Sequence, residues 1–199
     1  MSEIDSLLFQ ENNTSDSNFN AKAKKIAWRK TIRKESRDED FDTLITSVGG
    51  LPNTDEAVII KTNGCSDTGS IFTYINQKET VTEVYLSTWI ISRSNIERLL
   101  KCFDAGATLT FVVSKRLKEL KKSDYAYLVE QFQKRKGIKY KVANCHAKTF
   151  SVKTVQGNHY TVTGSGNWTE NPRIENYIIT NDVEYFGHNK EWMEEVTNG

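Results

Sequence analysis

The stretch "HAKTFSVKTVQGNHYTVTGSGN", residues 146–167, decides how the second half of the chain folds. Its β-branched and aromatic runs flank Gln156-Gly157-Asn158, which predicts a hairpin with strands over 147–155 and 158–165. Strand side chains alternate between faces, so His146 and Lys148 should point the same way, as should Ser165 and Asn167 if their strand continues. Paired strands lie about 5 Å apart, which brings all four polar groups toward one pocket. The alternative is a solvated hairpin on which the His and Lys are incidental.

These four residue types suit the binding and cleavage of a phosphate ester. The lysine supplies a positive charge for a non-bridging oxygen, and the serine and asparagine add neutral hydrogen-bond donors. Histidine, which titrates near neutral pH, can attack phosphorus or donate a proton. Gly164 and Gly166 leave the backbone bare on both sides of Ser165, which should let an anion approach its N–H groups. Because Lys148 can do the electrostatic work, we expect neither a metal nor another cofactor.

Composition places limits on the class of protein. The chain has 199 residues, 37% of them hydrophobic and 27% charged, with a net charge of +1. No apolar run approaches the roughly 20 residues of a membrane span, so we expect no membrane association. The three cysteines have no CxxC spacing and no secretory signal precedes them, which favours reduced thiols and a cytoplasmic location. The scattered histidines form no zinc-ligand pattern.

Strands and helices alternate before the hairpin and again after it. Strands are predicted over 57–62, 83–90, 107–114, 138–144 and 174–181, and helices over 67–77, 93–106, 115–137 and 184–196. Asp67 or Ser66 and Ser94 are candidate helix caps, and the long helix should break near Ser123-Asp124. The pattern predicts an α/β domain over residues 41–199, with a mixed β-sheet flanked by helices on both faces.

Residues 1–40 form a polar and then basic N-terminal arm, which we expect to be partly disordered or helical. The basic run over 21–35 favours a helix, and residues 38–48 favour a short helix that ends at Gly49-Gly50. The basic run is either a solvated helix face or an arm that contacts phosphates around Trp28.

The order HxK, then GSxN, then a glutamate resembles the signature of the phospholipase D superfamily. Here it comprises His146, Lys148, Ser165, Asn167 and Glu175, the last within "NPRIENYII". The strand, helix and strand of residues 83–114 also resemble that family, and the likeness spans roughly residues 55 to 185. It is closest in kind to the small single-motif nucleases of the superfamily and to nuclease-like proteins of phages and mobile elements.

The resemblance implies a phosphodiesterase that works through a phosphohistidine intermediate. A second histidine should protonate the leaving oxygen, and one motif per chain implies a homodimer in which each chain supplies its His146. Glu175 should hydrogen-bond His146 and fix its tautomer. The family's motif aspartate falls on Lys153, which strand parity turns away from His146, so its loss should affect local structure more than chemistry. The alternative is a catalytically impaired module that binds nucleic acid or a protein partner without cleaving it.

Four further residues are candidates for binding the substrate. Asp67 and Ser70 lie where a strand gives way to a helix, although both also suit helix capping. Trp89 and Trp168 could flank the pocket and stack on a base, although either could belong to the core. The basic arm favours nucleic acid over lipid as the partner, and a phospholipase is the third possibility.

Overall fold

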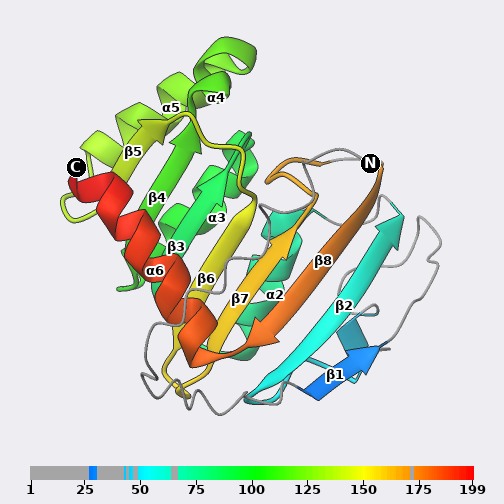
Figure 1. Cartoon of the computed structure of the whole chain (residues 1–199). Helices are drawn as coiled ribbons and strands as arrows, with labels where there is room; N and C mark the ends of the chain where they lie inside the picture. The colour runs from blue at the N-terminus through cyan, green and yellow to red at the C-terminus, as the bar shows by residue number, and fades with distance from the viewer. Residues whose placement is uncertain (1–26, 31–42, 44, 47–48, 64–66, 171–172) are drawn as a thin grey trace, which may run out of the picture.

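The strands among the described residues form one mixed sheet of eight, in the order β1-β2-β8-β7-β6-β3-β4-β5 (Figure 1). The structure is a computed structural model that describes residues 27–30, 43, 45–46, 49–63, 67–170 and 173–199. Its strands are β1 Ala27–Lys30, β2 Glu56–Asn63, β3 Val81–Thr88, β4 Thr108–Ser114, β5 Lys139–Ala143, β6 Thr149–Thr154, β7 His159–Gly164 and β8 Ile174–Asn181. Its described helices are α2 Thr68–Lys78, α3 Arg93–Asp104, α4 Lys115–Leu120, α5 Lys122–Gln133 and α6 Val183–Asn198.

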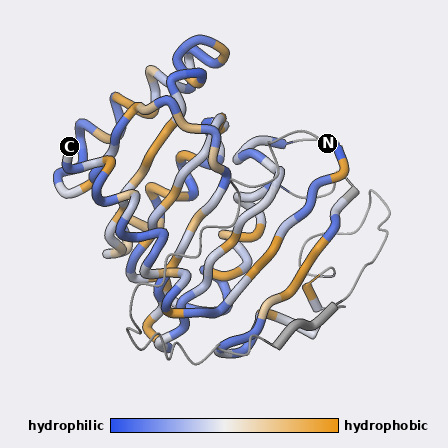
Figure 2. Tube along the Cα trace, viewed as in Figure 1, coloured by the Kyte–Doolittle hydropathy of each residue, from blue (hydrophilic) through white to orange (hydrophobic). Residues whose placement is uncertain are grey.

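Helices cover both faces of the sheet, as predicted. In Figure 1, α6 crosses the front, whereas α2 and α3 lie behind. The larger core joins the rear helices to the strands and includes Phe72, Leu99, Phe111, Phe150 and Val162. A smaller core lies under α6 and contains Tyr85, Val112, Phe186 and Met193. Figure 2 shows that hydrophobic residues gather in the strands, whereas most residues of α6 are hydrophilic.

The strand directions bring the loops of interest to one edge of the sheet. Strand β3 is parallel to β4 and antiparallel to β6, and β7 is antiparallel to both β6 and β8. The end of β7 and the beginnings of β6 and β8 therefore share an edge with the ends of β3, β4 and β5. This is the upper edge in Figure 1, and we call it the loop edge.

The predicted hairpin is present, with a glycine turn. Strands β6 and β7 pair from Thr149 opposite Thr163 to Lys153 opposite His159. Gly157 in the turn has a φ of 86°, in the left-handed region that glycine adopts most readily. Both strands are shorter than predicted, because pairing begins at Thr149 and ends at Gly164.

Several local predictions are confirmed and others are wrong. Asp67 caps α2 and Gly106, at a φ of 108°, follows the end of α3, both as expected. Ser92 caps α3 in place of Ser94, because its hydroxyl is the one that accepts from the N–H of Asn95. The long helix breaks at Lys121, slightly before the predicted point.

The N-terminal arm contains a strand where a helix was predicted. Residues 27–30 form β1, which pairs in parallel with the open side of β2 and satisfies backbone groups that a free edge would expose. The other predictions for residues 1–40 concern residues outside the described ones, as does most of the short helix predicted over 38–48. Of the described helices, none is long and apolar enough to cross a membrane.

Candidate functional site

Five predicted residues come together at the loop edge of the sheet. His146 and Lys148 lie in the connection from β5 to β6, just before the first residue of β6. Ser165 and Asn167 follow directly after β7. Glu175 is the second residue of β8, beside the end of β7. The hairpin and its neighbour β8 thus hold three short segments of the chain side by side.

His146 and Lys148 are in direct contact. The Lys148 Nζ atom lies 3.3 Å from His146 Nε2 and 3.4 Å from Nδ1, and it donates to the His146 carbonyl oxygen at 3.2 Å. Partial burial lowers the pKa of Lys148, and the nearby carboxylate of Glu175 opposes this shift. His146 itself is exposed, so its imidazole is accessible from solvent beside the ammonium group of Lys148.

Trp89 supports this pair from the end of β3. The centroids of its ring and the His146 ring lie 5.0 Å apart, with the planes inclined at 61°. Lys148 Nζ lies 5.7 Å from the centroid of the same indole. Contacts of this kind contribute about 0.5–1 kcal/mol each at exposed sites. The structure thus brings Trp89 next to the predicted histidine and lysine.

Ser165 and Glu175 form a second pair across β7 and β8. The hydroxyl of Ser165 donates to Glu175 Oε2 and accepts from the backbone N–H of Asn176 at 3.0 Å. The Ser165 N–H in turn donates to the Asn176 carbonyl oxygen at 3.0 Å. Glu175 is 6% exposed, so its charge is largely shielded from water. In the structure, the hydroxyl of Ser165 is therefore a partner of the Glu175 carboxylate. The expected hydrogen bond between Glu175 and His146 stays a prediction.

Asn167 presents a buried acceptor to the site. Its Oδ1 atom has no hydrogen-bond partner within the part of the chain that the structure describes. Its backbone is fixed, because Thr68 Oγ1 at the start of α2 donates to the carbonyl oxygens of Gly166 at 2.9 Å and Asn167 at 3.2 Å. Buried polar atoms are nearly always paired, so this oxygen, which accepts hydrogen bonds, is suited to a donor group of a ligand or of the protein.

The two glycines around Ser165 have a different role from the predicted one. A Cβ atom at Gly164 would lie 2.3 Å from the Asn176 carbonyl oxygen, and one at Gly166 would lie 2.0 Å from the Tyr177 hydroxyl. On the side where a Cβ atom would stand, the space is filled by β8, and the N–H groups of Gly164 and Ser165 already donate to the carbonyl oxygens of Lys148 and Asn176. Glycine is required at both positions because β8 packs closely against residues 164–166. This packing fixes the position of Ser165.

Of the four predicted substrate-binding residues, three have structural roles. Asp67 caps α2 through the Ser70 N–H at 2.8 Å and also accepts from the Ser70 hydroxyl. Asn95 Nδ2 donates to Asp67 Oδ2 at 2.6 Å, which ties α2 to α3. Trp168 is fully buried against Phe72 and Phe150, so it cannot stack on a base and that prediction is wrong.

Lys153 and His159 lie at the far end of the hairpin. Lys153 Nζ lies 3.4 Å from Glu83 Oε1, on the side of the sheet that α6 covers. This ion pair agrees with a local structural role at the position of the missing aspartate. The ring of His159 packs edge-to-face on Phe186, with the ring centroids 5.0 Å apart. Partial burial, and to a smaller extent the positive charge of Lys153, lower the pKa of His159. Thr68 and Asn95 were missed, because isolated polar residues give no sequence signal of such contacts.

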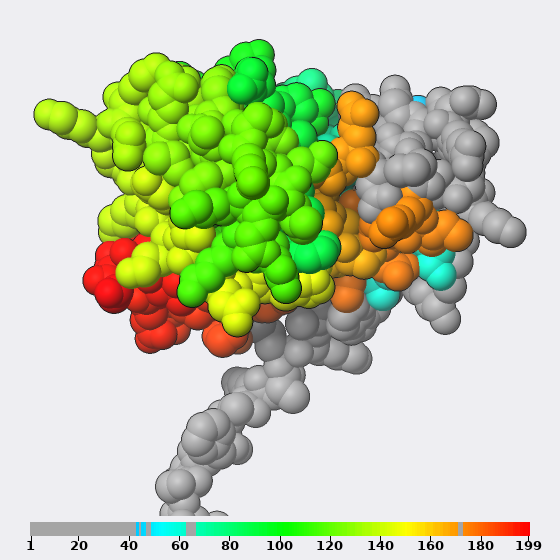
Figure 3. All heavy atoms as spheres, turned by 90° about the horizontal axis from the view of Figure 1, so that it is seen from above, coloured from blue at the N-terminus to red at the C-terminus, as the bar shows by residue number. Residues whose placement is uncertain are grey.

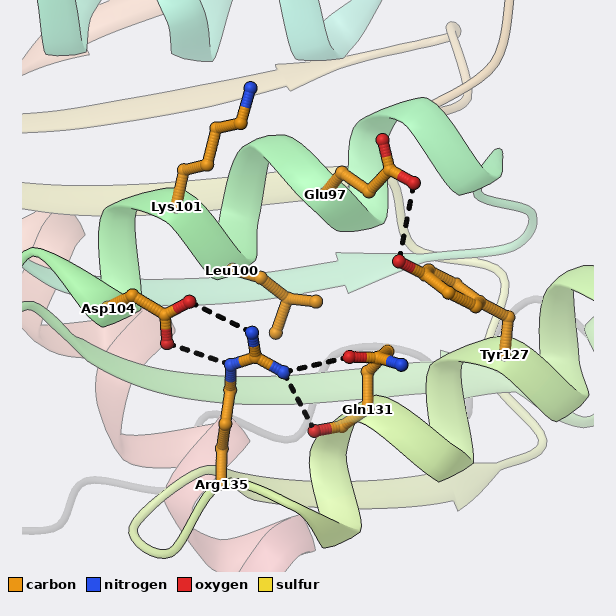
Figure 4. A pocket seen from close by; sticks show the side chains of 7 residues that line it. All are labelled: Glu97, Leu100, Lys101, Asp104, Tyr127, Gln131 and Arg135. Atoms are coloured by element: carbon orange, nitrogen blue, oxygen red, sulfur yellow. Dashed lines mark hydrogen bonds and ion pairs between the residues drawn. The ribbon is translucent and has the colours of Figure 1, made fainter.

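A small cavity of about 180 Å³ lies elsewhere, between α3 and α5 (Figure 4). Its polar groups already bind one another: Arg135 donates to both oxygens of Asp104 and to Gln131, and Tyr127 donates to Glu97. The cavity therefore does not compete with the loop edge as a site for a phosphate. Within the described residues, no group of three or more His, Cys, Asp or Glu side chains could hold a metal ion.

Comparisons with known proteins agree with this arrangement at the level of the fold. No family model and no curated protein matches the chain. Among solved structures, the chain resembles Nuc, a phospholipase D family member from Salmonella typhimurium, with 18% identity and a TM-score of 0.52. The match covers 71% of this chain and 93% of Nuc. The chain also resembles polyphosphate kinase from Porphyromonas gingivalis, with 16% identity and a TM-score of 0.51, over 70% of this chain and 23% of that enzyme.

The chain therefore has the phospholipase D fold, as the order HxK, GSxN and glutamate indicated. The likeness to Nuc concerns the fold, because the two sequences are 18% identical.

Proposed function

We propose that this protein is a phosphodiesterase, and specifically a nuclease that cleaves DNA or RNA without a metal ion. The observation that supports it is the convergence of His146, Lys148, Ser165, Asn167 and Glu175 at one edge of a phospholipase D-like sheet. Nuc, a phospholipase D family member, has a similar fold.

In the proposed reaction, a nitrogen of His146 attacks the phosphorus of the scissile phosphodiester. The bond from phosphorus to the leaving oxygen breaks, and His146 of the partner subunit gives that oxygen its proton. Water then attacks phosphorus, passes a proton to the same imidazole of the partner subunit, and breaks the P–N bond to release a phosphomonoester. Lys148 balances the charge on the non-bridging oxygens, and the Nδ2 group of Asn167 donates hydrogen bonds to them.

The dimer follows from the number of histidines at the site. Only His146 reaches the cluster among the described histidines, since His159 packs under α6 and His188 is exposed on α6. A two-fold axis near the loop edge would bring two copies of His146 to one phosphate. Trp89, beside His146, is then the described aromatic residue placed to contact a nucleotide base.

A cleavage assay in excess EDTA tests this proposal. Wild-type protein should cut labelled plasmid or single-stranded DNA, or labelled RNA, whereas His146→Ala should lose at least about 1000-fold in rate because the nucleophile is gone. His188→Ala, which removes an exposed histidine on α6, is the matched control and should cleave normally. Cleavage that requires Mg²⁺, or that persists in His146→Ala, would contradict the mechanism.

A second function is favoured by Lys153, which stands where the family has an aspartate and which binds Glu83. The protein would then use the same pocket to bind nucleic acid or a protein partner without cleaving it. Binding of the labelled nucleic acid without cleavage in the same assay would favour this module over the nuclease.

A further inference from the structure

Within the part of the chain that the structure describes, positive charge gathers in the segment from α4 to β5. Residues 115–141 contain ten lysines and arginines against three acidic residues, a net charge of +7. The whole chain has a net charge of only +1, so the rest of the chain is net negative. Such a local excess of positive charge attracts anions to the surface that carries it.

Part of this charge stands beside the loop edge. We use "α4 basic surface" for the exposed side chains of Lys115, Lys118, Lys121 and Lys122, on α4 and its junction with α5. None of the four makes an ion pair within the described part of the chain, whereas the neighbouring Arg116 binds Glu119 at 2.6 Å. Like charges so close together repel one another, and this cost is relieved when an anion binds.

The sheet places this surface next to the candidate site. Strand β4 ends at Ser114, which caps α4 and pairs with Ala143 at the end of β5. His146 follows Ala143 by three residues, a reach of at most about 11 Å along an extended chain. The connection that carries His146 must also pass the ends of β4 and β3 to enter β6. Figure 3 looks down on this edge and shows the green atoms of α4 and α5 beside the orange atoms that follow β7.

We propose that the α4 basic surface binds the sugar–phosphate backbone of a nucleic-acid strand whose scissile phosphate lies at His146. This inference rests on the proposed function for the identity of the site, and it adds where a long substrate runs. A single phosphate diester would fill the pocket of Lys148 and Asn167 alone. A polymer would also reach α4, so the protein should prefer long nucleic acids to small diesters.

Fluorescence anisotropy with a labelled single-stranded DNA of about 20 nucleotides tests the path of the strand. The test variant is Lys118→Glu/Lys121→Glu/Lys122→Glu, made in the His146→Ala background so that the probe stays intact. The matched control is Lys101→Glu/Lys136→Glu/Lys139→Glu, which reverses three exposed lysines at the opposite edge of the sheet. The neutral variant Lys118→Gln/Lys121→Gln/Lys122→Gln serves if the charge reversal prevents folding, and thermal melting checks all of them.

The test variant should bind on the order of 100-fold more weakly at about 0.1 M salt, and its log–log salt slope should fall by about 2, since three phosphate contacts are lost. The glutamine variant should shift in the same direction by less. The control should bind nearly as the parent does. An unchanged affinity and slope in the test variant, or equal losses in the test and control variants, would overturn the proposal.

A small substrate separates this inference from the proposed function. In the background that keeps His146, the α4 variant should hydrolyse bis(p-nitrophenyl) phosphate at the wild-type rate while cleaving long DNA poorly. Wild-type protein that hydrolyses neither substrate, yet binds DNA in an α4-dependent way, would refute the nuclease and support the binding surface. If wild-type protein hydrolyses both substrates but the α4 variant binds DNA as tightly as its parent, the nuclease would be supported and the α4 basic surface refuted.

Discussion

Ser165 owes its position to its neighbours in β8. Its hydroxyl is held between Glu175 Oε2 and the Asn176 N–H, and the glycines on either side allow β8 to approach. At Gly164 the obstacle to a side chain is a backbone oxygen, which cannot rotate away as a side chain could. A methyl group there would separate β7 from β8 at the point where the serine and the glutamate meet.

Gly164→Ala should therefore destabilise the protein by about 2–3 kcal/mol and reduce binding of phosphodiesters, because relieving the clash must move the backbone of β8. Gly187→Ala is the matched control. That glycine lies inside α6 with nothing within 4 Å of an added Cβ, so the change should stabilise the protein by about 0.5–1 kcal/mol. Urea unfolding of both variants measures the difference, and equal stabilities would refute the packing argument.

The hairpin is the element on which the site depends, and its register is fixed at the end away from the site. Glu79, the C-cap of α2, accepts hydrogen bonds from the Tyr160 hydroxyl at 2.7 Å, the Thr154 hydroxyl at 2.7 Å and Asn158 Nδ2 at 2.9 Å. A slip of one residue between β6 and β7 would turn every side chain to the other face. The carboxylate of Glu79 opposes such a slip, because it binds both strands and the turn.

Glu79→Ala should lower the free energy of unfolding by about 2 kcal/mol, since it leaves three donors unpaired and Tyr160 is nearly buried. Glu79→Gln keeps an acceptor and should cost less. Glu97→Ala is the control, because Glu97 is an exposed helical glutamate that also accepts from a tyrosine, at 3.3 Å, and its loss should change stability by less than about 0.5 kcal/mol. Equal losses for Glu79→Ala and Glu97→Ala in chemical denaturation would contradict the role assigned to Glu79.

The sequence is informative where the decisive contacts are local. The turn at Gly157 and the cap at Asp67 were predicted from short spacings, whereas the grouping of the motif residues was predicted from the hairpin and from the family resemblance. The contacts of Glu79 with Thr154, and of Thr68 with Gly166, join residues far apart in the sequence and leave no pattern in either segment. The burial of Trp168 was not predictable for the same reason, because a tryptophan beside a pocket and one beneath it have the same sequence context.

The strand order of the whole molecule is likewise set by long-range pairing. Alternating strands and helices predicted a mixed sheet, but not that β8 would insert between β2 and β7. That insertion brings Glu175 to Ser165 and so completes the cluster. The partner chain expected from the single motif depends on contacts of a still longer range, between molecules, which only an experiment on the assembly can test.

Mixing subunits tests whether two chains share one site. If each reaction needs His146 from both subunits, a dimer of one wild-type and one His146→Ala chain should be inactive. After free exchange in an equal mixture, about a quarter of the dimers would keep both histidines, whereas independent sites would keep about half of the activity. Activity should therefore fall with the square of the wild-type fraction.

Mixing with His188→Ala controls for exchange itself and should leave the rate unchanged, because that exposed histidine lies on α6, away from the cluster. A linear decline with the His146→Ala chain, or an active species that elutes as a monomer in size-exclusion chromatography, would contradict the shared site. A quadratic decline would assign the second proton-transfer group to the partner subunit. That result would also explain how a chain with one HxK motif can perform a reaction that requires two imidazoles.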